Sequence, residues 1–467
     1  MPIKFYNTYS RQIEEFTPIA PPQVKLYTCG PTVYSYAHIG NFRAYVFEDL
    51  LHRHLEARGF EVQRVMNLTD VDDKTIRGSR EAGISLFDFT AKFKRSFFED
   101  LESLRIKRAQ HFPAATDPEN LAKMIEMIEK LIEQDIAYQA EDRSIYFRIS
   151  RYSDYGKLAH LNLEELRPSG RIQTDEYEKE NIGDFALWKA WDEKDGPIGW
   201  DAPWGRGRPG WHIECSAMAT RLLGPELDIH CGGVDNIFPH HEAEIAQSEC
   251  VNHKRFVRYW LHNAHLLVEG QKMSKSLGNF YTLRDLLNKG FSGRELRYAL
   301  IRVNYRLPLN FTFDGLNEAR QSLLRLDDWV HRLRDIAGDA DPAMDLPAAS
   351  SEGFFEALDN DLNVSAALAE VFDQVRAANR AIDRSELAPG QAAVLLRWWD
   401  RINQVLQLQE QEAEIPENVC QLLQQRDAAR KRKNWEESDA LRAQIEAHGW
   451  MVKDTKDGQK LARKSAR

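Results

Sequence analysis

The stretch VKLYTCGPTVYSYAHIGNFRAYVFEDLLHRHLEARGFEVQRVMNL, residues 24–68, decides the fold of this chain. An apolar run with strand propensity opens it, a turn-rich loop follows, and a second apolar run closes it. A helix is predicted over residues 42–58, because apolar side chains recur there at helical spacing and Gly59 follows as a stop signal. These side chains are Phe42, Val46, Leu50, Leu51 and Leu55. A strand, a helix and a strand in this order form a βαβ unit, which predicts a parallel sheet.

Strand signals of the same kind return much later, at LDIHCGG (227–233) and YWLHNAHLLV (259–268). The block between, residues 113–200, has a helical pattern and a predicted edge strand, SIYFRIS (144–150). We therefore predict an α/β fold, a Rossmann-like doubly wound parallel sheet with an inserted domain. After residue 315 the pattern is helical, with helices expected over 315–337, 352–383 and 390–408, and a small unit ends the chain.

Composition limits the class of protein. The 467 residues exceed what one hydrophobic core usually supports, so we expect several domains. The sequence has neither an apolar run long enough to span a bilayer nor a secretory signal, so its five cysteines are expected to be reduced in the cytoplasm. A net charge of -10 argues against indiscriminate nucleic-acid binding, but residues 426–467 hold twelve Lys and Arg against seven acids, which suits an anionic partner there.

The loop CGPTVYSYAHIGN, residues 29–41, joins the first strand to the first helix, where a parallel sheet offers a crevice at its carboxyl edge. Gly30 and Gly40 leave space for a ligand, and the free N–H groups of the helix start favour an anion such as phosphate. His38 has the position to donate to a phosphate oxygen. A lone histidine more often caps or fills, so this loop alone is weak support.

A second loop, EGQKMSKSLGN (269–279), follows the returning strand. Lys272 and Lys275 make it a mobile cationic segment of the kind that closes on a polyphosphate, although most Lys/Ser runs are solvated surface loops. The two loops in this order resemble the paired signatures of class I aminoacyl-tRNA synthetases. Their pairing favours nucleotidyl transfer over the surface-loop interpretation.

The stretch NIFPHHEAEIAQSE, residues 236–249, suggests a metal site. His240 and Glu244 are four residues apart on an expected helix and share one face. With Cys215 and Cys29 they form a donor set that Zn²⁺ accepts, provided that the fold brings the segments together. Spacing alone leaves open a polar helix face with two buried filler thiols.

Together these segments resemble the cysteinyl-tRNA synthetase family over nearly the whole chain. The resemblance is carried by CGPTVYSYAHIGNFR (29–43), NLTDVDDKTI (67–76), DFALWKAW (184–191), PWGRGRPGWHIECSAM (203–218), GGVDNIFPHHEAEIAQSE (232–249) and KMSKSLGNF (272–280), and more weakly by LDNDLNVSAALAEVF and ARKRKNWEESDALRAQIEAHGW. The segments around the expected metal ligands separate this family from the other class I synthetases.

The resemblance implies one Zn²⁺ per chain, which selects the thiolate of L-cysteine over the hydroxyl of serine. Residues at the family's ligand positions are Cys29, Cys215, His240 and Glu244. Residues at its amino-acid pocket are Thr69 and Trp211, with Asp235 as a polar contact.

The resemblance also implies the reaction. The cysteine carboxylate attacks the α-phosphate of Mg²⁺-ATP, and the cysteinyl group then passes to the terminal ribose of tRNA-Cys. His38, Asn41, Lys272 and Lys275 are expected to position ATP and stabilise its charge, with Gly40 beside it. Arg430, Trp435, Asp439 and Asp454 are expected to meet the anticodon, since a tryptophan can stack on an unpaired base.

The expected domains follow from pattern and resemblance together. They are a Rossmann-like catalytic domain in two halves (1–112 and 201–268), a connective insertion (113–200), a KMSKS loop and stem-contact region (269–325), a helical bundle (326–410) and a C-terminal anticodon-binding domain (411–467). We expect a monomer.

Some residues depart from the family pattern. Asn41 stands where the family often has histidine, and its amide can still donate to a phosphate. Cys231 replaces a common glycine, and the chain end KDGQKLARKSAR lacks a Gly-Thr-x-Trp ending.

Three rival functions stay open at this point. They are a ligase that joins cysteine to an amino sugar in mycothiol synthesis, a zinc hydrolase with Glu242 as base, and a non-catalytic RNA-binding relative.

Overall fold

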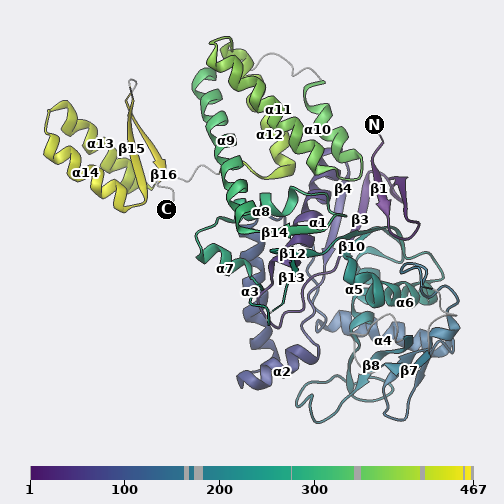
Figure 1. Ribbon diagram of the computed structural model, residues 1–467. Helices are drawn as coiled ribbons and strands as arrows, with labels where there is room; N and C mark the ends of the chain where they lie inside the picture. The colour runs from purple at the N-terminus through teal and green to yellow at the C-terminus, as the bar shows by residue number, and fades with distance from the viewer. Residues whose placement is uncertain are drawn as a thin grey trace. The chain divides into compact units, whose positions relative to one another are not determined.

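In the computed structural model, residues 24–68 fold as β3 (Gln23–Thr28), α1 (Ile39–Ala57) and β4 (Glu61–Met66) (Figure 1). The two strands pair in parallel, with Val24 opposite Val62 and Tyr27 opposite Val65. β10 (Leu227–Gly233) and β11 (Val257–Asn263) complete a parallel sheet of strand order β11-β10-β3-β4. The predicted βαβ unit and parallel sheet are confirmed.

The structure describes residues 2–161, 168–172, 182–274, 276–340, 349–410, 416–455 and 458–463. They fall into two compact units, Met1–Leu408 and Gln409–Arg467. Within the described residues, no helix has both the length and the apolar character needed to cross a membrane.

The sheet is covered on both faces, as a doubly wound fold requires. Leu26, Ile229 and Leu261 pack on one face with the buried side of α1. Tyr27 and Trp260 point to the other face, where they pack with α5 (Trp211–Leu223) and α6 (Glu242–Asn252). Since side chains alternate along a strand, His230 lies on the same face as α5 and α6, between Ile229 and Cys231 on the α1 face.

The segments around the sheet are an N-terminal hairpin, two helices after β4, and an inserted α+β region. The hairpin is β1 (Lys4–Asn7) with β2 (Gln12–Glu15), and the helices are α2 (Asp73–Ala82) and α3 (Leu86–Ser103). The insertion contains α4 (Pro118–Glu133), β5 (Ala137–Gln139), β6 (Ile145–Phe147), β7 (Pro168–Ile172), β8 (Ile182–Ala190) and β9 (Gly207–Pro209).

The expectation that SIYFRIS is an edge strand was wrong. It contributes β6, which pairs with β5 on one side and with β8 on the other. All three of its residues are buried, as an internal strand requires. The partner β8 lies far along the chain, so local sequence gave no sign of it.

The stretch 259–268 belongs to two strands rather than one. Its second part is β12 (Leu266–Val268), which pairs in parallel with β14 (Leu309–Phe311) and antiparallel with β13 (Gln271–Lys272). Two helices, α7 (Leu283–Asn288) and α8 (Gly293–Ile301), lie between β13 and β14 in sequence.

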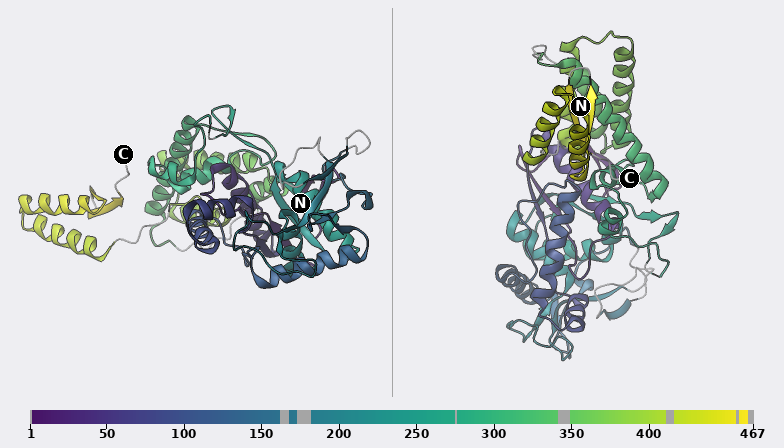
Figure 2. Two further views of the ribbon diagram at one scale, coloured as in Figure 1. Left: turned by 90° about the horizontal axis from the view of Figure 1, so that it is seen from below. Right: turned by 90° about the vertical axis from the view of Figure 1, so that its left-hand side faces the viewer.

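The helical region consists of α9 (Phe313–Ala337), α10 (Ala349–Asp359), α11 (Val364–Asp383) and α12 (Pro389–Leu406), gathered side by side (Figure 2). The single helix expected over 352–383 is two helices. Asp361 and Leu362 have positive φ angles, and the Asp361 carboxylate accepts hydrogen bonds from the Tyr6 amide and the Tyr305 hydroxyl. These contacts with distant residues therefore stabilise the break between α10 and α11.

The second unit contains α13 (Glu417–Lys431), α14 (Trp435–Ala447), β15 (Trp450–Thr455) and β16 (Gly458–Arg463). Val419, Ile445 and Trp450 form its small core. The unit contains the helix pair α13–α14, and part of the basic chain end forms the antiparallel pair β15–β16.

Candidate functional site

A cavity of about 560 Å³ opens at the carboxyl edge of the parallel sheet. Cys29 follows β3, Asn67 follows β4, Gly233 ends β10 and Asn263 ends β11, and all four residues line the cavity. This is the edge at which parallel sheets offer their ligand crevices, because the loops after neighbouring strands diverge there.

The start of α1 forms one wall of the cavity. His38 is the N-cap residue, and its Nδ1 accepts a hydrogen bond from the Asn41 amide at 3.2 Å. In return the His38 amide donates to Oδ1 of Asn41 at 3.1 Å. Because Nδ1 is an acceptor, the neutral ring carries its proton on Nε2, and because Oδ1 is engaged, the Asn41 Nδ2 is the donor that remains. This capping box therefore orients two N–H donors on a wall of the cavity.

A close approach of two backbone segments requires glycine at position 30. A Cβ at this position would lie 1.8 Å from the carbonyl oxygen of Asn67, and the Gly30 amide donates to Oδ1 of Asn67 at 2.9 Å. The space that we expected for a ligand is thus filled by the backbone after β4. At Gly40, a Cβ would be 3.0 Å from the His38 ring and 3.2 Å from Met273 Cε.

Gly30→Ala should lower the free energy of unfolding by about 3 kcal/mol or more, because backbone atoms cannot move aside for the new methyl group. Gly390→Ala is the matched control, since a Cβ there meets no atom within 4 Å and the position lies in α12. Urea unfolding of the three proteins measures the effect. Equal stability of Gly30→Ala and wild type would contradict this packing.

The KMSKS loop reaches the same cavity. Lys272 lines the cavity with an exposed side chain, and its carbonyl accepts from Asn279 across the loop. Beyond the loop, the Phe280 ring lies edge-on to the His38 ring at 5.2 Å, and the Ile39 amide donates to the Tyr281 carbonyl at 3.0 Å. The two signature loops therefore meet at one wall. Lys275 lies outside the described residues.

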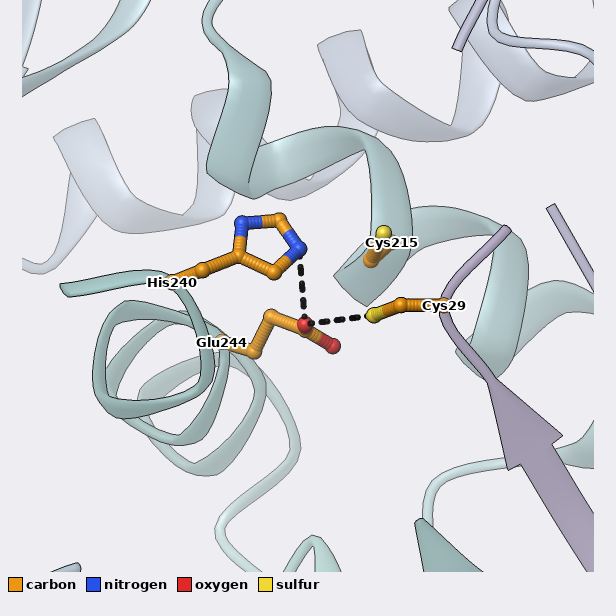
Figure 3. Close-up of side chains that lie close together, drawn as sticks. All are labelled: Cys29, Cys215, His240 and Glu244. Atoms are coloured by element: carbon orange, nitrogen blue, oxygen red, sulfur yellow. Dashed lines mark hydrogen bonds and ion pairs between the residues drawn. The ribbon is translucent and has the colours of Figure 1, made fainter. Parts of the chain in front are cut away.

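The four expected metal ligands lie close together (Figure 3), and three of them, Cys29, Cys215 and His240, line this cavity. Cys29 follows β3, Cys215 lies in α5, His240 lies in the turn before α6, and Glu244 lies in the first turn of α6. Their donor atoms all lie within 4.8 Å of one another. Nε2 of His240 is 3.1 Å from Oε1 of Glu244, so the two side chains meet as their spacing predicted, although His240 lies in a π-helical turn (Ile237–His241) that leads into α6.

Neighbouring groups shift the pKa values of three of these four residues. Burial opposes ionisation of Cys215, yet the hydrogen bond from Cys29 and the nearby His240 lower the pKa of its thiol to about 6. Burial also works against a charged His240, but Cys215 and Glu244 raise its pKa to about 10. Despite its own burial, Glu244 has a pKa lowered to about 2 by His230 and His240. These shifts favour a thiolate at Cys215, a carboxylate at Glu244 and a proton on His240.

This donor set fits a thiophilic divalent cation. A cation would replace the proton on His240, and two thiols, an imidazole and a carboxylate are all accepted by Zn²⁺. Cys29, His230, His241 and Glu244 form a second convergent set. Cys29, Cys215 and His240 of the first set line the cavity, whereas the second set has only Cys29 there. A cation held by the first set would therefore be accessible to a ligand in the cavity.

Four further histidines support these ligands, and sequence analysis did not single them out. Nε2 of His230 forms a hydrogen bond with Oε2 of Glu244 at 3.0 Å, and Nε2 of His241 lies 3.3 Å from the Cys29 sulfur. Nδ1 of His212 forms a hydrogen bond with Nδ1 of His240 at 3.0 Å, and Nε2 of His262 forms one with Nδ1 of His241 at 2.8 Å. Burial lowers the pKa of His262 to about 3, so this imidazole is neutral at physiological pH and takes part in fixing the ligands through hydrogen bonds.

The residues expected to contact the amino acid lie at different depths. Trp211 lines the cavity and stacks on His240, with ring centroids 4.1 Å apart, and Asp235 also lies on the cavity wall. Thr69 is buried behind the wall, where its hydroxyl donates to Glu214 at 3.0 Å.

Glu242 cannot serve as the base of a hydrolase in this arrangement. Its side chain is fully buried, and its two oxygens accept hydrogen bonds from the amides of Gly156 (2.7 Å) and Ala159 (2.9 Å). The carboxylate therefore fixes the inserted region to α6 instead of facing the cavity. This geometry removes the basis of the zinc-hydrolase alternative.

In the second unit, Arg430 contacts two of the other residues expected at the anticodon, Trp435 and Asp454. The Arg430 guanidinium lies 5.7 Å from the Trp435 ring centroid and 3.0 Å from Oδ2 of Asp454. Trp435 is 57% exposed, which leaves its ring available for stacking. Asp439 is exposed one helical turn after Trp435.

Three families match this chain. Residues 15–321 match the class I (C) catalytic domain of tRNA synthetases, residues 353–408 the DALR domain, and residues 412–461 the anticodon-binding domain of cysteinyl-tRNA ligase. Among solved structures, methionyl-tRNA synthetase of Mycobacterium tuberculosis bound by methionyl-adenylate is similar with a TM-score of 0.64 at 15% identity, covering 82% of this chain and 92% of that one. At this identity the likeness shows a shared fold.

Sequence relatives are much closer. The cysteine–tRNA ligase of Chlamydia muridarum is 54% identical over 475 residues, covering 99% of both chains. That of Protochlamydia amoebophila is 50% identical over 469 residues, covering 99% of this chain and 98% of the other. Given these matches over almost its whole length, the chain belongs to the cysteine–tRNA ligase family of class I tRNA synthetases.

Proposed function

We propose that this protein activates L-cysteine with Mg²⁺-ATP and transfers the cysteinyl group to tRNA-Cys. The observation that carries the proposal is the thiol-containing donor cluster, three members of which line a cavity whose wall is built by both signature loops. Relatives of the same length carry the name of this activity. We further propose that the protein works as a monomer in the cytoplasm.

Substrate selection is assigned to a Zn²⁺ held by Cys29, Cys215, His240 and Glu244. When bound, this ion supplies a soft Lewis acid that accepts the substrate thiolate and discriminates against the hydroxyl of serine. The chain's own residues fix the geometry: the stacked Trp211 and the hydrogen-bonded His212 orient the His240 ring, and His230 orients Glu244. A selection of this kind needs no editing site.

The amino-acid end of the site is assigned to Trp211, Asp235 and Thr69. The exposed Asp235 carboxylate on the cavity wall suits the α-ammonium group of cysteine. Trp211 closes the wall beside His240. Thr69 is proposed to act from behind the wall, by holding Glu214 beside Cys215.

Adenylate formation is assigned to His38, Asn41, Lys272 and Lys275, with Gly40 giving ATP room to approach the helix start. Nε2 of His38 and Nδ2 of Asn41 donate to phosphate oxygens, and the two lysines compensate the charge that develops at the α-phosphate. The cysteine carboxylate is the nucleophile and pyrophosphate leaves, so no protein nucleophile takes part.

The second unit is proposed to bind the anticodon through Arg430, Trp435, Asp439 and Asp454. The exposed ring of Trp435 offers a stacking surface, and Arg430 and Asp454 offer polar groups beside it. This unit also separates a tRNA ligase from the amino-sugar ligase alternative, which has no use for an anticodon-binding domain.

Transfer of labelled cysteine to deacylated tRNA-Cys, by purified protein with Mg²⁺-ATP, tests the proposal. We expect charging of tRNA-Cys and none with labelled serine. Cysteine-dependent pyrophosphate exchange without charging would point to another acceptor such as an amino sugar. Absence of both reactions in zinc-loaded protein would favour the non-catalytic alternative.

A further inference from the structure

Four aromatic rings, which we call the strip, lie on the signature loop and on α3, and three of them form a chain of contacts. Tyr34 and Tyr36 belong to the loop, and Phe89 and Phe93 belong to α3. The ring of Tyr36 meets that of Phe93 at 5.4 Å, and Phe93 meets Phe89 at 5.1 Å, both edge to face. All four rings are partly exposed. The catalytic groups assigned above use none of them.

Cations lie over these rings. Lys92 is 5.8 Å from the Tyr36 centroid and 5.4 Å from that of Phe93, and Arg284 is 5.3 Å from Tyr36. Arg284 is compensated by Glu99 and Asp100. Lys92 is exposed on α3 and, within the described part of the chain, forms no ion pair. Its charge is therefore available to an anion that passes over the rings.

The strip begins at the rim of the cavity. Thr32 and His38 flank the two tyrosines in sequence, and both line the cavity. Lys74, which lies 5.5 Å from the Tyr34 ring, lines the cavity as well. A molecule that lay along the strip would thus have one end at the mouth of the cavity.

We propose that this strip, Tyr34, Tyr36, Phe89 and Phe93 with Lys92, receives the unpaired 3′ end of the tRNA. The inference rests on the proposed function, in which the terminal ribose of tRNA must reach this cavity for the transfer step. Partly exposed rings stack on unpaired bases whatever their sequence, and cations beside them compensate the phosphates. None of these five side chains lines the cavity, so we expect activation of cysteine to be independent of the strip.

The test compares binding of intact tRNA-Cys with binding of tRNA-Cys that lacks its unpaired 3′-terminal nucleotides. Wild type should bind the intact tRNA about tenfold more tightly than the truncated one. In Lys92→Glu this ratio should fall close to one, and in Lys92→Arg it should persist. Arg95→Glu is the matched control, because Arg95 is exposed on the same helix and contacts none of the four rings within the described residues.

Cysteine-dependent pyrophosphate exchange, which needs no tRNA, should be unchanged in Lys92→Glu. The proposal is overturned if Lys92→Glu keeps the tenfold ratio, or if Arg95→Glu loses it equally. It is also overturned if pyrophosphate exchange falls together with tRNA binding, because the strip would then support the activation site rather than the tRNA. Failure of wild type to exchange pyrophosphate would instead refute the proposed function. The binding comparison requires no catalysis and distinguishes the two failures.

Discussion

Cys215→Ser should fail to hold the zinc ion proposed for this site and should therefore lose cysteine-dependent pyrophosphate exchange. Metal affinity should fall by at least about 100-fold, because even loss of a residue that only supports a metal ligand costs 10- to 100-fold. The structure gives the reason: although burial opposes ionisation of Cys215, the neighbouring Cys29 and His240 lower the pKa of its thiol to about 6, so this donor loses its proton more readily than a free thiol. A serine hydroxyl at this position stays protonated and is a poor ligand for a soft cation.

Zinc content by elemental analysis and pyrophosphate exchange are the two measurements. Cys250→Ser is the matched control, since Cys250 is a buried thiol of α6 that belongs to neither convergent donor set. We expect it to keep its zinc and its activity. A Cys215→Ser protein with a full complement of zinc would show that the zinc is held elsewhere.

His38→Asn should lower kcat of adenylate formation by about 100- to 1000-fold, the usual cost of losing one donor to developing charge. Asparagine is a good N-cap residue, so α1 keeps an acceptor for the Asn41 amide, while the donor at the position of Nε2 is lost because Nδ2 of the shorter asparagine lies closer to the backbone. Zinc content and the free energy of unfolding should stay near those of wild type. The variant therefore separates loss of the donor from loss of the fold.

Asn41→His serves as the comparison for His38→Asn. It places the residue that the family often carries at this position, and an imidazole N–H also donates to phosphate, so kcat should stay within about tenfold of wild type. Steady-state pyrophosphate exchange with varied ATP gives kcat and KM for both variants. An unchanged kcat in His38→Asn would remove His38 from the assignment of the activation step.

Local patterns predicted the parts of this fold that local interactions determine. Helical spacing of apolar residues after Phe42 predicted α1, and the four-residue spacing of His240 and Glu244 predicted their shared face. The residue types also suggested Cys29 and Cys215 as further donors, but only the family resemblance favoured a shared site over two buried filler thiols, because both cysteines reach the cluster through the packing of α5 and β3.

The features that sequence analysis missed depend on tertiary contacts. β6 has a distant partner strand, and the break at Asp361 is held by Tyr6 and Tyr305. The supporting histidines come from separate elements. The sequence signals that pointed to them were the position of His241 next to His240 and the position of His230 within an apolar strand. The role of Glu242 as an anchor for the insertion depends on amides of a loop more than 80 residues away.

The central claim is that a zinc ion at Cys29, Cys215, His240 and Glu244 selects cysteine. Pyrophosphate exchange with cysteine and with serine, measured before chelation, after complete removal of metal and after return of Zn²⁺, tests it most directly. We predict exchange with cysteine that disappears with the metal and returns with it, and no exchange with serine at any stage. Cysteine-dependent exchange that persists in metal-free protein would contradict the account.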